Sequence, residues 1–465
     1  MFRVGKMAGL SSYEIRNWSS SCIFSRHDYS SVMSSTAAQL HARAAEVMPG
    51  GVSATARRNA ALGHPFYIAR GEGARVYDLD GREYVDLCCS HGASLLGHGH
   101  PAIRAAVQRA LELGAVCAAE TEYQVALAHR LRDLVPCAEM ARFSSSGTET
   151  MMHALRLARA ATGRDKFIKF EGHFHGYSDF LNFSWAPPLA ADPTAPYAES
   201  AGIPRDTAQH VIVVPFNDPD ALRAAFAAHD GQVAALIMEP VNYDSGCILP
   251  QPGFLQTCRE LCDAHGAMLF FDEVLTAFRA AAGGAQQLYG VTADLAVLGK
   301  AFGGGMPISA LVGRREVMEH MRPLGSCEMS GTYLSHITAV LAAQAALEQF
   351  ASPGFYEQMH AVGERFYAGF HDVIARSGVA VRMQHCGPRF GLYFGLDPDE
   401  PVLNYRMAAR QDHAQFLRFV RGCIERGLYV HVSAHHGFSA VHTDAEMDFA
   451  LAAIEGALTD VHKEF

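Results

Sequence analysis

The stretch Leu269–Met306 reads LFFDEVLTAFRAAAGGAQQLYGVTADLAVLGKAFGGGM. Two short apolar runs, at 268–271 and 295–298, fall at its start and within it, and each is followed closely by a charged residue, Asp272 and Lys300. Continuous apolar runs of this kind are typical of strands that are buried on both faces of a parallel sheet. Because such sheets bind ligands at the carboxyl ends of their strands, we expect Asp272 and Lys300 to face one crevice.

Two interpretations account for this pair of charges. A lysine that forms a Schiff base and an aspartate that faces a pyridinium nitrogen are the pair that a pyridoxal phosphate site requires. A buried structural ion pair accounts for the same two residues equally well. The rest of the chain has to distinguish the two.

Composition narrows the classes of protein. A chain of 465 residues has room for one large α/β domain with a smaller companion. A net charge of −10 argues against nucleic acid as a partner, and no apolar run approaches the ~18 residues that a membrane span needs. The 11 cysteines, none of them in a C-x-x-C motif, indicate reduced thiols in a cytoplasmic enzyme. The histidine pairs lack cysteine or carboxylate partners at ligand spacing, so we expect no metal site.

Residues 1–33 differ from the rest of the chain, because they are rich in serine and show no period of strand or helix. We interpret them as a disordered or non-native N-terminal extension, with Met33 a candidate for the true start. An organellar transit peptide is the competing interpretation; Arg3, Lys6 and Arg16 favour it, and acidic residues argue against it.

Strands and helices alternate through the middle of the chain, which predicts βαβ units and a parallel or mixed sheet. Residues 302–306 with Ser309–Val312 suggest a strand that bends back at an edge of this sheet. After the break at 352–354 the pattern changes to an α+β domain. We therefore predict an N-terminal segment of a small domain at 34–90, a large domain at 91–340 and a C-terminal small domain at 341–465.

Two further segments carry candidate site residues. Ser146, Gly147 and Thr148 lie between a short strand and a long helix, so they present a helix N-terminus to an anion, although an ordinary capped helix start explains the same pattern. Phe174 follows another strand and could lie flat on a cofactor ring, although core packing is the commoner fate of a phenylalanine.

Six motifs in one order carry a resemblance to a known family: FSSSGTETMMHALRLARAATGRDK, FEGHFHGY, MEPV, FFDEVLTAFR, DLAVLGKAFGGGMP and GTY. Together they resemble the class III (fold type I) pyridoxal-phosphate-dependent aminotransferases, in the branch of glutamate semialdehyde aminomutase and D-phenylglycine aminotransferase. The resemblance covers about Leu40 to Val461. It implies an α/β fold with a large domain built on a mostly parallel seven-stranded sheet. It also implies a smaller α+β domain formed by the two chain ends.

The same resemblance implies a role for each matching residue. Lys300 would bind the cofactor as a Schiff base and move the proton at the substrate carbon, and Asp272 would hold the protonated ring nitrogen. Thr332 would reach the phosphate of a neighbouring subunit, which implies a homodimer with shared active sites. The cofactor contacts implied by the resemblance are Ser146, Gly147, Thr148, Phe174, His175, Glu239, Asp272, Val274, Lys300 and Thr332.

The residues expected to contact the substrate match the family pattern less closely than the cofactor contacts do. Arg57 matches the family arginine that binds a substrate carboxylate, with Arg58 and Arg279 as rivals. The segment Ser433–Phe438 has His436 where the aminomutase has a glutamate near the substrate amino group, and the loop after Gly331-Thr332 also departs from the aminomutase pattern. These departures favour an aminotransferase that moves an amino group between a non-standard (D-, aromatic or β-) amino acid and a 2-oxo acid.

Three other functions remain open at this point: a glutamate-1-semialdehyde 2,1-aminomutase, a racemase or epimerase of the same fold, and an inactive binding protein. Residues that could line the substrate pocket are His91, Tyr177, Tyr243, His435 and His436.

Overall fold

The structure of the protein, a computed structural model, describes residues 36–114, 116 and 118–465. The predicted N-terminal extension, residues 1–33, lies outside the described residues. Within them, no helix combines the length and the apolar character needed to cross a membrane.

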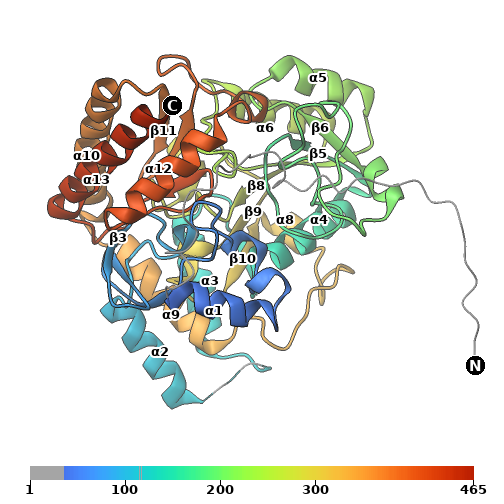
Figure 1. The fold of residues 1–465 in the computed structure, drawn as a ribbon. Helices are drawn as coiled ribbons and strands as arrows, with labels where there is room; N and C mark the ends of the chain where they lie inside the picture. Colours follow the sequence, from blue (N-terminus) through green and yellow to red (C-terminus); the bar gives the residue numbers. More distant parts are fainter. Residues whose placement is uncertain (1–35, 115, 117) are drawn as a thin grey trace, which may run out of the picture.

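A seven-stranded sheet runs through the centre of the molecule, in the order β4-β10-β9-β8-β7-β5-β6 (Figure 1). Four of its six neighbouring pairs are parallel, and the other two are antiparallel because β10 runs antiparallel to both β4 and β9. The predicted mostly parallel sheet is thereby confirmed. Its strands are β4 (Met140–Ser144), β5 (Lys166–Phe170), β6 (Val211–Val214), β7 (Val233–Met238), β8 (Met268–Glu273), β9 (Leu295–Leu298) and β10 (Ser309–Gly313).

The prediction of an edge strand at Ser309–Val312 is wrong. β10 pairs on both sides, with β4 and with β9, so the edges of the sheet are β4 and β6. Residues 302–306 form no strand, because Lys300–Gly303 is a short 3₁₀ helix and the chain turns at Gly304, which has a φ of 57°. This turn reverses the chain and returns β10 into the sheet.

The sheet is buried on both faces. Along β7, Ala235 and Ile237 pack into one apolar cluster, whereas Leu236 and Met238 pack into another. Alternate residues of a strand point to opposite faces, so these two clusters lie on the two sides of the sheet. Helix α4 (Gly147–Thr162) covers the first face and helix α6 (Phe254–His265) covers the second.

The two chain ends meet in smaller sheets beside this core, as Figure 1 shows with blue strands close to red and orange helices. One sheet has the order β1-β2-β3-β13, and β13, near the end of the chain, is parallel to β3. The other has the order β11-β12-β14. The strands are β1 (Ile68–Glu72), β2 (Arg75–Asp78), β3 (Glu83–Asp86), β11 (Val381–Cys386), β12 (Arg389–Phe394), β13 (Leu428–Tyr429) and β14 (His435–Gly437). The boundaries predicted for the domains remain a prediction.

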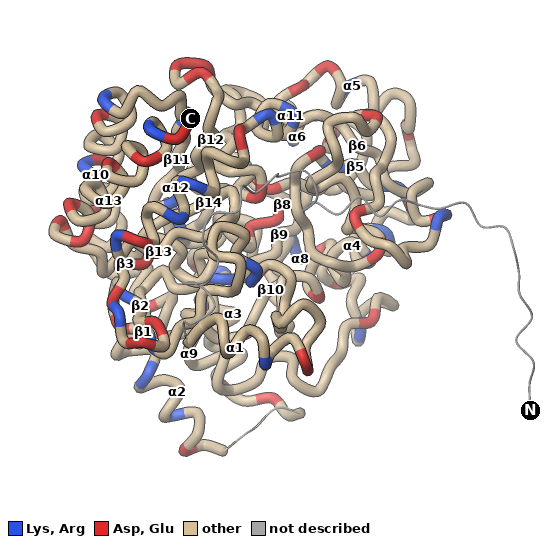
Figure 2. The backbone as a smooth tube through the Cα atoms, viewed as in Figure 1, with Lys and Arg blue, Asp and Glu red and all other residues tan. Residues whose placement is uncertain are grey.

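Most of the remaining helices match the apolar periodicity of their sequence. They are α1 (Thr36–Ala45), α2 (Pro101–Leu113), α3 (Glu122–Leu134), α5 (Pro219–Ala228), α7 (Gly284–Tyr289), α8 (Arg315–Met318), α9 (Ile337–Phe350), α10 (Phe355–Ser377), α11 (Tyr405–Ala408), α12 (His413–Glu425) and α13 (Asp444–Glu464). Figure 2 shows acidic and basic residues close together on α10 and α13, where Arg376 pairs with Glu455 at 3.1 Å. Such exposed pairs contribute little to stability.

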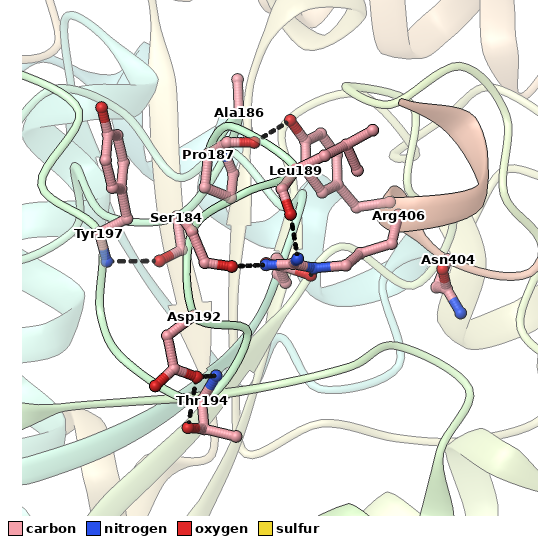
Figure 3. Close-up of polar contacts among 12 residues, drawn as sticks. Ser184, Ala186, Pro187, Leu189, Asp192, Thr194, Tyr197, Asn404 and Arg406 are labelled. Carbon is pink, nitrogen blue, oxygen red and sulfur yellow. Dashed lines mark hydrogen bonds and ion pairs between the residues drawn. The ribbon is translucent and has the colours of Figure 1, made fainter. Parts of the chain in front are cut away.

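Arg406 of α11 joins the C-terminal part of the chain to the loop 184–197 of the large sheet region (Figure 3). Its guanidinium pairs with Glu171 at 2.7 Å and donates to the carbonyl oxygens of Leu189 at 2.9 Å and Ala191 at 3.0 Å. Glu171 is buried and directly follows β5. The pair therefore fixes the start of the segment that carries Phe174.

We expect Arg406→Ala to lower the free energy of unfolding by roughly 2–4 kcal/mol, because it leaves the buried carboxylate of Glu171 without its cation. Because Arg406 itself is partly exposed, we expect a smaller loss of stability than for a pair in which both side chains are buried. Urea denaturation followed by circular dichroism measures the difference. Arg376→Ala, which breaks an exposed pair, serves as the matched control and should cost less than about 1 kcal/mol. Equal losses in both variants would contradict the argument.

Candidate active site

A cavity of about 400 Å³ opens at the carboxyl ends of β8 and β9, where Asp272 and Lys300 were expected to meet. The lining contains nine of the ten predicted cofactor contacts together with residues that were not predicted. The complete lining is Ala93, Ser145, Ser146, Gly147, Thr148, Met151, Phe174, His175, Gly176, Glu239, Asp244, Asp272, Val274, Leu275, Lys300, Gly305, Met306, Pro307, Ile308 and His435.

Lys300 begins the 3₁₀ helix that follows β9, and its backbone is in the left-handed region with a φ of 45°. A non-glycine residue is strained there, and such strain concentrates at functional sites. Desolvation, assisted by the nearby Arg279 and Arg389, lowers the pKa of Lys300 to about 8, although Glu239 and Asp272 act in the opposite direction. The amine is therefore closer to its nucleophilic neutral form at pH 7 than an exposed lysine is.

Asp272 is the fifth residue of β8 and is almost completely buried. Its Oδ2 lies 2.8 Å from Nδ1 of His175, and its Oδ1 accepts a hydrogen bond from the backbone N–H of Val274 at 3.1 Å. Burial lowers the pKa of His175, and the hydrogen bond to Asp272 only partly opposes this effect. A neutral imidazole thus holds the carboxylate in place without neutralising its charge.

The N-terminus of α4 forms one end of the cavity. Ser146 caps the helix, and its Oγ accepts a hydrogen bond from the N–H of Glu149 at 3.3 Å. A Cβ on Gly147 or on Gly299 would lie 3.1 Å from a methyl group of Val274, so a larger residue at either position would have to displace Val274 by a few tenths of an ångström. The first N–H groups of a helix have no partner within it and attract anions, and this helix end opens into the cavity.

Phe174 and Glu239 form a side wall. The N–H of Phe174 donates to Oε1 of Glu239 at 3.0 Å, and the N–H of Tyr243 donates to Oε2 at 3.2 Å. Burial, reinforced by Asp244 and Asp272, raises the pKa of Glu239 well above its ordinary value. The Phe174 ring contacts Trp185 edge to face, with the ring centroids 5.6 Å apart, and this contact limits its rotation.

Three of the predicted cofactor and substrate contacts do not line the cavity, and neither do the pocket candidates His91, Tyr177 and Tyr243. Arg57 is exposed and its guanidinium bonds to Ser53, and Thr332 is exposed in the segment before α9. His436 is fully buried on the other side of β14, near Phe390 and Phe416. Neighbouring residues of a strand point in opposite directions, so His435 enters the cavity and His436 does not. The prediction of a substrate contact therefore moves from His436 to His435.

Asp244 and Arg389 were not predicted from the sequence as residues of the site. Asp244 lines the cavity, and desolvation raises its pKa to about 7 against the attraction of Lys300 and Lys169. Arg389, at the start of β12, is fully buried behind His435. A lone acid in a loop and a lone arginine in an apolar strand give no periodic signal, although a charged residue within a buried strand is itself unusual enough to mark a site.

The cavity fits pyridoxal phosphate at each of its polar ends. The N-terminus of α4 suits the phosphate, the carboxylate of Asp272 suits a protonated ring nitrogen, and Lys300 suits the aldehyde. Phe174 and Val274 provide apolar side chains in the cavity lining for the ring.

Comparison with known proteins agrees with this fit. Residues 56–429 match the family described as Aminotransferase class-III. The chain is 40% identical to the glutamate-1-semialdehyde 2,1-aminomutase of Roseiflexus castenholzii over 425 aligned residues. The alignment covers 91% of this chain and 96% of that protein.

Solved structures give the same result. An omega-transaminase from Sphaerobacter thermophilus superposes with a TM-score of 0.86 at 32% identity, over 92% of this chain and 98% of that one. A structure described as a transaminase with pyridoxal phosphate bound superposes with a TM-score of 0.84 at 30% identity, over 92% and 98% of the two chains. The matched family spans most of the chain and includes every residue of the cavity except His435. The protein is accordingly a member of the class-III aminotransferases, which are pyridoxal-phosphate-dependent enzymes of fold type I.

Proposed function

We propose that the enzyme moves an amino group between a non-standard amino acid, D-configured, aromatic or β-amino, and a 2-oxo acid. The observation that carries this proposal is the wall formed by β14. The segment Ser433–Phe438 reaches the cavity through His435 and contains no carboxylate, whereas the aminomutase that the chain resembles has a glutamate in this segment. The likeness to an omega-transaminase at 32% identity supports the same reaction.

Glutamate-1-semialdehyde 2,1-aminomutase is the second candidate. The name of the curated relative at 40% identity favours it over an aminotransferase, because that likeness extends over nearly the whole of both chains. Both reactions begin with the same transfer of an amino group and differ in whether the product leaves before the second transfer. Racemisation or epimerisation in the same cavity is a third possibility, with no observation that favours it.

Bound pyridoxal phosphate supplies an electron sink for the negative charge that forms when the substrate carbon loses a proton. The residues that hold it are Ser146, Gly147 and Thr148 at the phosphate, Phe174 and Val274 on the two ring faces, and Glu239 with His175 at the side and end of the ring. Of these, His175 acts through Asp272, to which it bonds at 2.8 Å.

Lys300 and Asp272 perform the chemistry that the chain itself contributes. Nζ of Lys300 would hold the cofactor at its aldehyde, and once the substrate has taken its place the free amine would accept the proton from the substrate carbon. Its pKa of about 8 suits both tasks near neutral pH, because the amine loses and regains a proton readily there. Asp272 would face the ring nitrogen, and its carboxylate would favour the protonated, electron-withdrawing form of the ring.

The functional form in this proposal is a homodimer in which Thr332 reaches the phosphate site of the neighbouring subunit. Two observations support it: Thr332 is exposed, and the adjacent Tyr333 exposes a large apolar ring. Tyrosine is enriched at protein interfaces, so an exposed ring next to Thr332 is compatible with such a contact. The substrates are small amino and oxo acids, and the cytoplasmic location stays a prediction from the cysteine content.

An amine-donor panel decides between the two candidates. With D-, L- and β-amino acids as donors, we expect the purified enzyme to aminate pyruvate or 2-oxoglutarate at a rate that depends on both substrates. We expect no conversion of glutamate 1-semialdehyde to 5-aminolevulinate when no second substrate is added. Chromatography of the products measures both reactions. Conversion of the semialdehyde alone, without amination of either oxo acid, would establish the aminomutase instead.

A further inference from the structure

Two arginines beside the cavity are buried without a carboxylate partner among the described residues. Arg279 donates to the carbonyl oxygens of Leu275 at 2.9 Å and Gly92 at 2.6 Å. Arg389 donates to the carbonyl oxygens of Cys88 and His435, both at 3.3 Å. Both guanidinium groups are almost inaccessible to solvent, at 1% and 0% exposure. A buried cation whose partners are all neutral is costly, and an anion in the adjacent cavity would offset that cost.

Arg389 also determines the state of His435. Its Nη2 donates a hydrogen bond to Nδ1 of His435. A guanidinium group has donors only, so Nδ1 must be the acceptor and the imidazole proton must be on Nε2. Burial, with Arg389 and Lys300 as further causes, lowers the pKa of His435 well below its ordinary value. The ring is therefore neutral and fixed in one tautomer.

The position of His435 connects this pair to the reacting centre. β14 pairs with β12 so that His435 is opposite Gly391, and this register turns the His435 ring into the cavity that also contains Lys300. Tyr243 limits the ring from another side, with the ring centroids 6.3 Å apart. A single N–H donor, polarised by a buried guanidinium, thus faces the space beside the reactive amine.

The backbone next to this pair is strained. Cys89, Ser90 and His91 are three consecutive non-glycine residues in the left-handed region, with φ of 48°, 54° and 52°. Non-glycine residues adopt this conformation only at an energetic cost. The strain is held by Asp86, whose Oδ1 accepts from the N–H groups of Cys88 at 2.8 Å and Cys89 at 3.0 Å. Strain that is fixed in this way next to a cavity indicates a site that is arranged for a ligand.

We propose that His435, backed by Arg389, is the site that binds the carboxylate of the amino substrate. Nε2–H of His435 donates to a carboxylate oxygen, and the charge of Arg389 stabilises the anion through the imidazole ring. The substrate class is thereby an amino acid rather than a simple amine. This inference rests on the proposed function, because it places a substrate of amino-group transfer in the same cavity. It replaces Arg57, which the described chain leaves exposed outside the cavity lining.

Ligand binding to the cofactor-loaded enzyme tests the site without turnover. Benzoate and benzamide have similar shapes, but only benzoate is an anion, and isothermal titration calorimetry measures the affinity of each. We expect benzoate to bind at least about tenfold more tightly than benzamide, since a hydrogen bond to a charged group is worth ~1.5–3 kcal/mol. This preference should disappear in Arg389→Met and in His435→Phe. Arg376→Met, at an exposed arginine of α10, should retain it.

Two results would overturn the proposal: a preference for benzoate that survives in His435→Phe, or one that disappears in Arg57→Ala while Arg389→Met retains it. His435→Phe keeps the ring volume, so it remains informative if Arg389→Met fails to fold.

Kinetics with phenylglycine and benzylamine separate this inference from the proposed function. In His435→Phe, a rise of about tenfold in KM for phenylglycine, with no change in KM for benzylamine, supports the site. Equal changes for both donors overturn the site and leave aminotransfer intact. If neither donor reacts in the unmodified enzyme, the proposed function fails while the benzoate measurement still decides the site.

Discussion

Lys300→Ala is expected to lower the rate of amino-group transfer by on the order of 10⁴-fold or more, because the variant loses its nucleophile and its proton carrier together. No other lysine lines the cavity among the described residues, so none is placed to replace it. Lys169 is the nearest buried alternative, but its Nζ donates to the carbonyl oxygen of His173 at 2.9 Å and is fully enclosed. The variant should still bind the cofactor through its phosphate.

Two measurements check this expectation. Borohydride reduction followed by peptide mass analysis should find the cofactor attached to the peptide that contains Lys300 in the unmodified enzyme and to no peptide in Lys300→Ala. Steady-state assays give the rate. Lys463→Ala removes an exposed lysine from the last turn of α13 and should behave as the unmodified enzyme. Attachment of the cofactor at any other lysine would refute the assignment of the cavity.

Asp272→Asn is expected to lower the rate by on the order of 10³-fold, since a neutral amide cannot stabilise a positive charge on the ring nitrogen. The amide is nearly the same size as the carboxylate, so the packing at the end of β8 should change little. His175 loses the anion that partly offsets its desolvation, so the pKa of His175 should fall further. The loss should appear in kcat more than in the affinity for the cofactor.

A second buried aspartate provides the matched control for this variant. Asp294 bonds to Arg259 and Arg314, both at 2.8 Å, and lies just before β9 rather than at its carboxyl end. Asp294→Asn should lower the urea midpoint while leaving kcat of the folded enzyme nearly unchanged. Visible absorption spectra and urea titrations of both variants separate the two effects. If Asp272→Asn changed only stability, Asp272 would be a structural ion-pair residue.

The central sheet could be predicted from sequence because its strands are enclosed on both faces. β9 matches the predicted range 295–298 to the residue, and β8 begins at residue 268 as predicted, since a run of apolar residues without alternation has one simple explanation in an α/β protein. Burial on both faces determines the residue types of these strands strongly enough to mark where they begin.

The substrate side of the cavity could not be predicted in the same way. β14 has three residues, His435–Gly437, and its existence depends on pairing with β12, which is distant in sequence. A short strand of this kind has no periodic pattern, so the sequence could not show which of two adjacent histidines faces the cavity. The position of β10 inside the sheet was missed for a related reason, because strand order depends on tertiary contacts and not on local composition.

The pairing of β13 with β3 affects how the molecule is made. Leu428 and Tyr429 align with Val85 and Asp86, so β3, which also pairs with β2, acquires its second partner only when almost the entire chain has been synthesised. All strands of the central sheet lie between residues 140 and 313, and they can associate earlier during synthesis. Until then the edge of β3 is unpaired and open to incorrect association, which makes it a natural place for a chaperone to bind. β14, which places His435 in the cavity, is also synthesised late. The residues expected to bind the cofactor are therefore present in the nascent chain before His435, which we propose binds the substrate.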